Sequence, residues 1–553
     1  MDTDYQGRVF AYVPMPAPAG RHPVVVVGAG PVGLATAIDL AQNGVPVLLL
    51  DDDDKLANGS RAICFAKRTL EIFDRLGCGD RIAARGVRWH VGRVFNRDQE
   101  VYRFDLLPET GHERPAFVNL QQYHVEGFLY ERARELPRLD LRWRSKVTGL
   151  VQQADHVVLT VTTPDGEYVL EAAYVVAADG GKSTVRSLMG LESHGRTFRD
   201  RFLIADVKMT ADFPAERWFW FDPPFHPGQS VLLHRQPGNI WRIDFQLGWD
   251  ADPVLETSPG RVIPRIQALL GKDAEFTLEW VSIYTFRCLR MDGFRHGRVL
   301  FAGDAAHGVS PFGARGANSG VQDADNLAWK LRMVIAGEAP DALLDSYAGE
   351  REQAADENIR HSTRSTDFIT PKSAVSKLFR DAVLQLAKDQ PFARRLVNSG
   401  RLSTPTSYLD SALNTPDSEP FAGCMRPGAP AADAPLAVQG VPCWLLRQTG
   451  NGFTGVYFAG GAREAADFLQ AAAPVRTLVV APAGQGGPGI LEDSEGLFAA
   501  RYDARPGSYY LLRPDQHLCA RWRRFDPQAV RAALARACGH AGATHTQQQM
   551  EPA

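Results

Sequence analysis

Paired cysteines and long apolar runs are what this sequence most clearly lacks. Its seven cysteines never occur in CxxC spacing and are odd in number, which argues against a zinc site or a redox disulfide and fits free thiols in a reducing compartment. No apolar run approaches the roughly 20 residues of a membrane span. The N-terminus is acidic at its start and rich in proline, unlike a signal peptide. These absences predict a cytoplasmic protein with no metal site and no membrane segment.

An excess of charge of one sign is also absent. The chain has 61 Lys and Arg against 64 Asp and Glu, for a net charge of −3, so it offers no electrostatic footprint for nucleic acid. Its length of 553 residues is too great for a single core, and about three domains are expected.

The strongest pattern that is present lies in residues 23–51. An unbroken β-branched run, Val24 to Val27, is typical of a strand buried on both faces of a parallel sheet. Of the glycines that follow, the first allows a tight turn, the second lets the backbone approach a pyrophosphate, and the third lets the next helix lie close to the strand. These glycines are Gly28, Gly30 and Gly33.

A helix and a second strand complete this unit. The helix ends at Asn43 and Gly44, and its free N–H groups and positive dipole end favour an anion. The second strand leads to Asp51, whose carboxylate can accept hydrogen bonds from an adenosine ribose and disfavours a 2′-phosphate. Strand, turn, helix, strand and acid in this order predict a dinucleotide site, although the motif alone does not distinguish FAD, NAD and NADP.

Two later segments repeat the order of strand, small turn and helix. In AYVVAADGGKSTVRSLMG a buried strand ends at Asp179, and the two glycines after it present backbone to phosphate. In GRVLFAGDAAHGVSPFGARGANSG a strand ends at Gly303 and Asp304, ahead of a loop and a long helix. Asp304 is therefore placed where a carboxylate could bind a polyol hydroxyl.

Together the three segments resemble the fingerprints of class A flavoprotein monooxygenases, the family of para-hydroxybenzoate hydroxylase and 3-(3-hydroxyphenyl)propionate hydroxylase: GxGxxG, DGxxSxVR and GDAAHxxxPxxGxG, over residues 23–400. The resemblance implies FAD as cofactor and NAD(P)H as a transient reductant. It implies that Asp179 is tied to both nucleotides. It implies further FAD contacts at the ADP half (Gly28, Gly30, Gly33, Asp51), on the flavin side (Arg61, Gln122), at the ribityl chain (Asp304) and at the pyrimidine end of the ring (Gly316, Asn318).

Two positions depart from the family pattern. Asp51 replaces the commoner Glu, which keeps the charge and shortens the reach, and Arg315 stands where many relatives have Gln. A fixed positive charge near the pyrimidine end would stabilise an anionic reduced ring. The alternative is that Arg315 faces a carboxylate or solvent. Pro311, in the loop after GDAAH, is expected to line the cavity between flavin and substrate.

Residues 201–284 interrupt the cofactor motifs. Four segments, RFLIADVKM, SVLLHRQ, IWRIDFQL and FTLEWVSIYTF, are typical of strands, and an aromatic cluster, RWFWFDPPF, lies between the first two. They resemble the sheet that covers the substrate in such hydroxylases. Apolar and polar residues alternate in IWRIDFQL, so one face should look at the flavin ring, and the sequence leaves open which. The candidates for binding or deprotonating a phenol, each alternatively an ordinary sheet residue, are His234, Arg242, Asp244 and Tyr284.

The expected fold class is α/β. It comprises a Rossmann-type FAD-binding domain, an inserted mixed β-sheet substrate domain and a thioredoxin-like α/β domain at the C-terminus, which lacks CxxC and is therefore expected to be structural or oligomeric. The expected parts are an N-terminal arm (1–22), the FAD-binding domain (23–200 and 285–400), the substrate domain (201–284), a linker (401–419), the thioredoxin-like domain (420–540) and a disordered tail (541–553).

The resemblance implies a single-component monooxygenase that hydroxylates an aromatic, phenolic substrate with NAD(P)H and O2 through a flavin hydroperoxide. The same cofactor chemistry could serve epoxidation, decarboxylative hydroxylation or oxygenation of a thioester-linked or natural-product ring. A non-catalytic flavin-binding scaffold is the alternative from another class. A small aromatic molecule and O2 are the expected partners, and a homodimer is left open.

Overall fold

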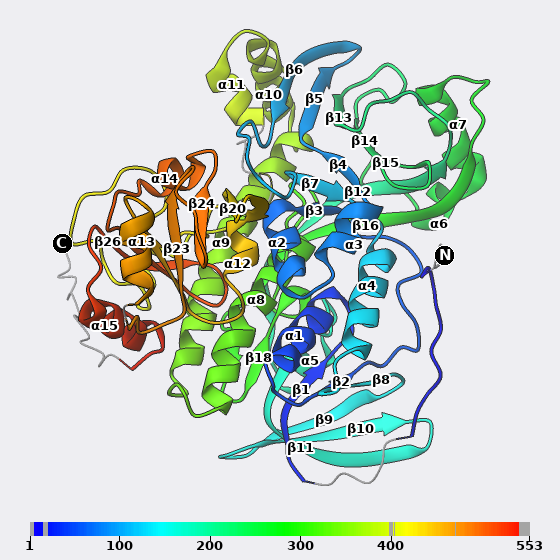
Figure 1. Cartoon of the computed structure of the whole chain (residues 1–553). Helices are drawn as coiled ribbons and strands as arrows, with labels where there is room; N and C mark the ends of the chain where they lie inside the picture. Colours follow the sequence, from blue (N-terminus) through cyan, green and yellow to red (C-terminus); the bar gives the residue numbers. More distant parts are fainter. Residues whose placement is uncertain (1–4, 15–19, 398–401, 403, 471, 541–553) are drawn as a thin grey trace, which may run out of the picture. The chain divides into compact units, whose positions relative to one another are not determined.

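A computed structural model of the chain describes residues 5–14, 20–397, 402, 404–470 and 472–540 (Figure 1). The chain divides into two compact units, Met1–Ala328 with Arg351–Pro405 and Trp329–Glu350 with Thr406–Ala553. The finer division into FAD-binding, substrate and C-terminal domains stays a prediction, and the tail expected to be disordered lies outside the described residues. None of the described helices combines the length and apolar character of a membrane span.

The first sheet of the first unit has a parallel centre. Its strand order is β17-β18-β11-β1-β2-β8, in which the last five strands are parallel. Strand β10 pairs antiparallel with β11, and β9 pairs antiparallel with β10. The side chains of Val24 to Val27 are at most 7% exposed, as expected of a strand covered on both faces. This arrangement confirms the Rossmann-type fold. The bounds are β1 (His22–Val27), β2 (Val47–Leu50), β8 (Leu139–Arg142), β9 (Lys146–Gln152), β10 (Val157–Thr163), β11 (Gly166–Ala177), β17 (Arg295–His296) and β18 (Val299–Phe301).

Helix α1 (Pro31–Gln42) begins directly after the glycine turn. Gly30 is its N-cap, and Pro31 occupies the first turn, where a proline needs no N–H partner. Gly44 follows its C-terminus with a φ of +92°, the left-handed conformation that ends many helices. α1 packs against α4 (Gln122–Arg134). The other helices within this unit are α2 (Lys67–Arg75), α3 (Gly79–Arg85), α5 (Thr184–Leu188), α6 (Pro253–Glu256), α7 (Pro259–Leu270), the short η1 (Gly303–Ala305), α10 (Ala374–Ala387) and α11 (Pro391–Val397).

The second sheet has eight strands in the order β19-β16-β12-β15-β14-β13-β5-β6. It is mixed, because β13 and β5 are parallel whereas its other pairs are antiparallel. Four strands are those predicted from the sequence; RWFWF, expected only as an aromatic cluster, forms β13, and β5 and β6 come from an earlier part of the chain. The bounds are β5 (Val91–Asn96), β6 (Gln99–Asp105), β12 (Ser193–Lys208), β13 (Arg217–Phe221), β14 (Ser230–Arg235), β15 (Ile240–Leu247), β16 (Thr277–Met291) and β19 (His307–Gly308).

The two faces of this second sheet differ in character. On β15, Trp241, Ile243 and Phe245 belong to a buried apolar cluster that also contains Val262 and Ile266 of α7. The alternate residues of the same strand project from the opposite face. That opposite face carries the polar candidates predicted from the sequence.

A small antiparallel sheet is formed by residues that lie between β2 and β8 in the sequence. It consists of β3 (Cys64–Ala66), β7 (Phe117–Asn119) and β4 (Val87–Trp89), with β7 in the centre. Trp89 stacks on Phe117, with ring centroids 4.8 Å apart. The sheet therefore anchors the segment that follows the loop after β2.

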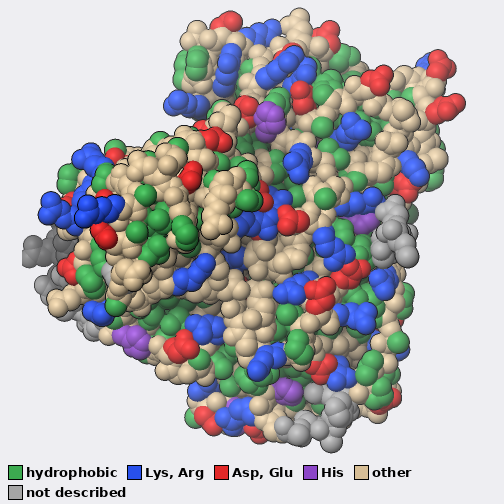
Figure 2. Space-filling view, viewed as in Figure 1, with side chains coloured by type: hydrophobic (Ala, Val, Ile, Leu, Met, Phe, Trp, Pro, Cys, Tyr) green, Lys and Arg blue, Asp and Glu red, His purple; other side chains and the backbone are tan. Residues whose placement is uncertain are grey.

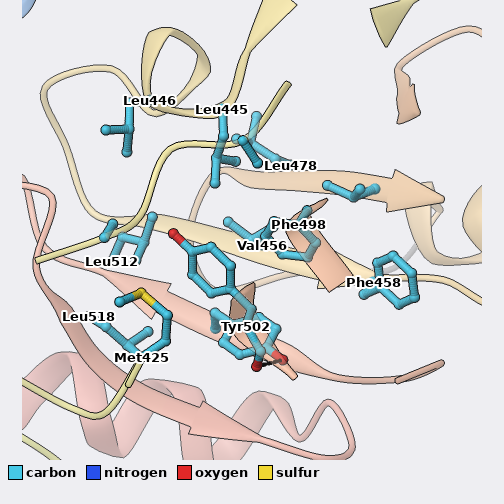
Figure 3. Packing of buried hydrophobic residues seen from close by; sticks show 14 of the residues in the cluster. Met425, Leu445, Leu446, Val456, Phe458, Leu478, Phe498, Tyr502, Leu512 and Leu518 are labelled. Atoms are coloured by element: carbon cyan, nitrogen blue, oxygen red, sulfur yellow. Dashed lines mark hydrogen bonds between the residues drawn. The ribbon is translucent and has the colours of Figure 1, made fainter. Parts of the chain in front are cut away.

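The second unit is built on a seven-stranded mixed sheet in the order β21-β20-β24-β23-β22-β25-β26. Its core includes Met425, Val456, Phe498, Tyr502 and Leu512 (Figure 3). It has the predicted α/β character, and its likeness to thioredoxin stays a prediction. The bounds are β20 (Pro435–Val438), β21 (Val441–Trp444), α12 (Leu445–Gln448), β22 (Thr454–Phe458), α13 (Ala462–Leu469), β23 (Thr477–Pro482), β24 (Ile490–Asp493), α14 (Leu497–Tyr502), β25 (Tyr509–Leu512), β26 (Leu518–Trp522) and α15 (Pro527–Ala537).

Two long helices, α8 (Gly316–Ile335) and α9 (Leu343–Ile369), contribute to both units, because the second unit includes the segment Trp329–Glu350. Lys330 binds Glu350 across these helices at 2.8 Å, and Glu350 also receives two bonds from Arg513, at 2.6 and 2.9 Å. The second carboxylate partner of Arg513 is Asp515. All four side chains are buried, so their charges are compensated inside the protein.

Charged side chains of both signs share the surface. On the face shown in Figure 2, basic and acidic side chains are interspersed, in line with the net charge of −3. A mixed surface of this kind creates no strong field of one sign on that face.

The buried ion cluster of the second unit gives a stability prediction. Arg513→Met leaves Asp515 without its guanidinium partner and removes the two bonds to Glu350, so we expect the free energy of unfolding to fall by about 3–5 kcal/mol. Urea titration followed by circular dichroism measures this change in the full chain. Arg531→Met, at an exposed position of α15, is the matched control and should change stability by less than about 0.5 kcal/mol. Equal effects of the two substitutions would contradict the assignment.

Candidate functional site

Each of the three glycines after β1 is glycine for a different structural reason. Gly28 has a φ of +103°, and a Cβ there would lie 2.5 Å from the carbonyl oxygen of Ala178. A Cβ on Gly33 would lie 1.8 Å from the carbonyl oxygen of Gly28, so the helix can approach the turn only without a side chain. A Cβ on Gly30 would meet no atom within 4 Å. Gly30 therefore faces open space at the N-terminus of α1.

Asp51, directly after β2, binds this turn. Its carboxylate accepts hydrogen bonds from the backbone N–H of Ala29 at 2.5 Å and of Asp53 at 2.9 Å. Burial raises the pKa of Asp51 to about 6, and the charges of Asp52 and Asp53 add to this rise. The acid thus stands beside the glycine turn, as the dinucleotide motif predicted.

The loop after β2 is held by α4. Gln122 accepts a hydrogen bond from the backbone N–H of Ala62 at 3.1 Å and donates to Glu126 at 2.8 Å. Glu126 in turn accepts from the N–H of Ala57 at 2.9 Å. Gln122 therefore has a structural role in this loop, and its contact with the flavin stays a prediction. Arg61 of the same loop is exposed.

The Asp179 turn is tied to the Asp304 turn by Arg186. Asp179 accepts a hydrogen bond from the N–H of Val185 at 3.0 Å, and its other carboxylate oxygen is buried without a partner in the described part of the chain. Arg186 donates to the carbonyl oxygens of Ala305 at 2.7 Å and Gly181 at 2.8 Å. Sequence reasoning did not give Arg186 a role, although it is the last residue of the DGxxSxVR pattern.

Asp323 of α8 holds the Asp304 turn from within. It accepts a hydrogen bond from the N–H of Gly303 at 2.9 Å and pairs with His307 at 2.7 Å and Arg351 at 2.5 Å. Burial opposes ionisation here, but the charges of Arg351 and His307 prevail and lower the pKa of Asp323. Asp323, which the sequence did not single out, therefore fixes the turn as an anion.

Asp304 itself is accessible but recessed. Its side chain has exposed surface, yet desolvation by the surrounding protein raises its pKa, against the opposing charges of His307 and Arg61. Tyr284 of β16 lies near enough that the charge of Asp304, second to burial, raises the pKa of the phenol. The turn thus brings Asp304, Arg61 and Tyr284 within electrostatic range of one another.

The start of α8 is rigidly bonded. Asn318 accepts a hydrogen bond from the N–H of Ala66 at 2.8 Å and donates to the carbonyl oxygens of Cys64 at 2.8 Å and Ala314 at 2.5 Å. Arg315 is buried and donates to Asn358 of α9 at 3.0 Å. Of the other predicted residues here, Gly316 is the first residue of α8 and Pro311 is exposed.

Arg242 of β15 decides which face of the second sheet looks toward the cofactor turns. Its guanidinium binds Asp206 of β12, with nitrogen to oxygen distances of 2.8 and 2.7 Å. It also donates to the carbonyl oxygens of Ser60 and Arg61, the latter at 3.3 Å, in the loop after β2. The face that carries Arg242, Asp244 and Gln246 is therefore the one directed at this loop.

His234 and Asp244 share that polar face. His234 lies opposite Arg242 in the strand register, with its Nδ1 3.9 Å from the sulfur of Cys64. Burial, together with the charges of Arg217 and Arg242, lowers the pKa of His234 well below its ordinary value. One carboxylate oxygen of Asp244 is buried without a partner in the described part of the chain. Burial raises the pKa of Asp244 to about 6.

These features fit FAD. Open space at Gly30 adjoins a helix N-terminus suited to a pyrophosphate, Asp51 stands beside it for a ribose, and the accessible Asp304 can bind a polyol. The unpartnered oxygen of Asp179 is a further acceptor near the same turns.

Comparison with known families decides the classification. Residues 21–362 match the family model described as an FAD binding domain, which covers more than half of the chain. The chain belongs to this family. Proteins similar to it over much of their length are named monooxygenases and hydroxylases, and the chain is an FAD-dependent monooxygenase.

Three relatives of this monooxygenase illustrate the likeness. It is 31% identical over 538 residues to the 6-methylpretetramide 4-monooxygenase of Streptomyces rimosus, covering 94% of each chain. It is 36% identical over 346 residues to a probable NADH-specific resorcinol 4-hydroxylase of Rhodococcus jostii, covering 61% of this chain and 64% of the relative. Its fold matches the flavin-dependent monooxygenase PieE with a TM-score of 0.79 at 23% identity, over 95% of this chain and all of the other.

The glycine turn provides a paired prediction. Gly30→Ala adds a methyl group that meets no protein atom, so we expect an unchanged melting temperature of the FAD-free protein and loss of most bound FAD. Gly28→Ala should lower both the melting temperature of the FAD-free protein and the amount of bound FAD, because its Cβ meets the backbone of Ala178 and its φ is left-handed. FAD absorbance after purification and calorimetry of the FAD-free protein measure the two effects. Full FAD occupancy in Gly30→Ala would contradict the placement of the pyrophosphate.

Proposed function

We propose that this FAD-dependent monooxygenase hydroxylates a phenolic ring that lies against the polar face of the second sheet. The observation that carries the proposal is one carboxylate oxygen of Asp244 that is buried without a hydrogen-bond partner among the described residues, on the face that Arg242 directs at the loop after β2. NAD(P)H is the proposed reductant, and O2 is the second substrate.

Asp244 is the best base among the predicted candidates. Arg242 is engaged by Asp206 and by backbone carbonyls, and the lowered pKa of His234 keeps that ring neutral. Tyr284 has a raised pKa and therefore keeps its proton. Asp244, with a pKa of about 6, is ionised near neutral pH and has a free oxygen to accept a phenolic proton.

Different residues of the chain would hold the cofactor and act on the substrate. When bound, FAD supplies the oxygen-transfer chemistry. Gly28, Gly30 and Asp51 would hold its ADP part, and Asp304 its polyol. Transfer of the phenolic proton to a carboxylate oxygen of Asp244 increases the electron density of the ring, which favours attack by an electrophilic oxygen. Phe202, opposite Gln246 in the strand register, packs against Phe286 and Phe312, and apolar side chains at this position exclude water.

The substrate class is supported by the names of the relatives. One is named a resorcinol 4-hydroxylase and others a 3-(3-hydroxy-phenyl)propionate hydroxylase, both of which refer to phenols. A natural-product ring is the second candidate, because the relative named for 6-methylpretetramide aligns over 94% of the chain. Both candidates require the same base and the same cofactor.

A cytoplasmic location is part of the proposal. All seven cysteines are free, as expected in a reducing compartment. A homodimer, which the sequence left open, is not needed to complete the residues named above.

The proposed function is tested with purified, FAD-loaded protein. A panel of phenols is added with NADH or NADPH while NAD(P)H oxidation, O2 uptake, peroxide release and hydroxylated product are measured. We expect at least one phenol to accelerate NAD(P)H oxidation and to yield product in proportion to O2 consumed. A yellow protein that releases only peroxide with every phenol would contradict the proposal and favour a flavin-binding scaffold.

The role of Asp244 predicts a pH dependence. Because a base must be deprotonated to act, kcat/KM for hydroxylation should rise as the pH increases through about 6 and then level off. Asp244→Asn should lower kcat/KM by a factor of about 100 or more and abolish this rise. Bound FAD is measured at each pH, because the pKa of Asp51 is also about 6. A profile of Asp244→Asn that kept the rise would refute the assignment.

A further inference from the structure

Arg217, the first residue of β13, lies on the same polar face as Asp244. Trp218 pairs with Leu233 in the antiparallel register, which brings the preceding residue, Arg217, beside His234. Arg217 is 8% exposed, and its Nε is buried without a hydrogen-bond partner among the residues that the structure describes. In the described part of the chain no carboxylate forms an ion pair with it. This arginine was hidden from sequence reasoning inside the aromatic cluster RWFWFDPPF.

A buried guanidinium without a carboxylate is costly. Moving such a charge out of water is unfavourable unless other groups pair with it and satisfy its donors. Burial accordingly lowers the pKa of Arg217, although the neighbouring Cys64 and Asp244 act in the opposite direction. The other arginine of this face, Arg242, is by contrast fully engaged. The donors of Arg217 are thus available to a molecule from outside the chain.

Arg217 and Asp244 carry opposite charges on the same face, but no hydrogen bond joins them among the described residues. Each has a buried polar atom without a partner, and they do not bind one another. They are nevertheless within electrostatic range, because the charge of Asp244 acts to raise the pKa of Arg217 and the charge of Arg217 acts to lower the pKa of Asp244. A guanidinium only donates hydrogen bonds, and an ionised carboxylate only accepts them. The pair therefore offers one donor site and one acceptor site on one face of the sheet.

We propose that Arg217 binds a carbonyl or carboxylate oxygen of the substrate while Asp244 accepts the proton of a neighbouring ring hydroxyl. The preferred substrates are then aromatic hydroxy-carbonyl compounds rather than simple phenols. This inference rests on the proposed function, since it takes Asp244 as the base. A simple phenol satisfies Asp244 alone and leaves the charge of Arg217 buried and unpaired.

Three naphthols with the same ring system test the inference: 1-naphthol, 2-acetyl-1-naphthol and 1-hydroxy-2-naphthoate. Their dissociation constants for the FAD-loaded protein are measured from the change in flavin absorbance. We expect Arg217→Met to weaken the acetyl and carboxylate compounds by a factor of about 10 to 100, the value of one hydrogen bond from a charged group, and 1-naphthol by less than about twofold. The acetyl and carboxylate arms distinguish a neutral carbonyl from an anion.

Further variants separate a ligand contact from a structural effect. Arg217→Gln keeps a donor without the charge and should retain part of the affinity for the acetyl compound while losing that for the carboxylate. Arg103→Met, at an exposed position of β6 in the same sheet, is the matched control and should change none of the three constants. Asp244→Asn should weaken all three.

Several outcomes would overturn the inference. The inference fails if Arg217→Met weakens the binding of all three naphthols equally, or if it weakens none of them. It also fails if the wild-type protein does not bind the acetyl and carboxylate compounds at about 1 mM. If other phenols are still hydroxylated in those cases, only the hydroxy-carbonyl assignment fails. If the protein binds no FAD or hydroxylates no phenol, the proposed function fails instead.

Discussion

One buried guanidinium joins the parts of the candidate site. Arg242 binds Asp206 within its own sheet and reaches the carbonyl oxygens of Ser60 and Arg61 in the loop after β2. Its charge is compensated by the carboxylate, so the cost of burying it is offset while its remaining donors hold a loop from a distant part of the sequence. Strand pairing sets the positions of the candidates on the polar face, and this contact joins that face to the loop.

The polar residues of that face are all largely buried, and their different partners give them different roles. Residues of similar chemistry behave differently because their partners differ: Asp206 is neutralised by Arg242, whereas Asp244 keeps an oxygen without a partner and a pKa of about 6. Burial, together with the positive charges of Arg217 and Arg242, lowers the pKa of His234 and keeps its ring neutral. A site of this kind needs few reactive groups, because FAD supplies the chemistry and the protein supplies position, charge and exclusion of water.

The cofactor turns could be predicted from the sequence because their determinants are local. The tight turn at Gly28 and the acid at Asp304 follow directly from short motifs, and both lie at the turns expected. Asp323 and Arg217 could not be predicted, since their roles depend on contacts between distant segments, such as the parallel pairing of β13 with β5. Arg315 shows the same limit, because its bond to Asn358 depends on how α9 lies beside α8.

Helices α8 and α9, which contribute to both units, limit where the chain can be cut or fused to another protein. α8 continues from the first unit into the second, and α9 continues from the second unit into the first. Lys330 and Glu350, near these two borders, bind each other, and Glu350 also binds Arg513 of the second unit. The covalent linker before residue 420 is therefore not the physical border of the modules. A fragment ending there would carry two helical segments on which Lys330 and Glu350 still pair but no longer contact Arg513, so gene fusions made at that point would expose a charged surface that is buried in the full chain.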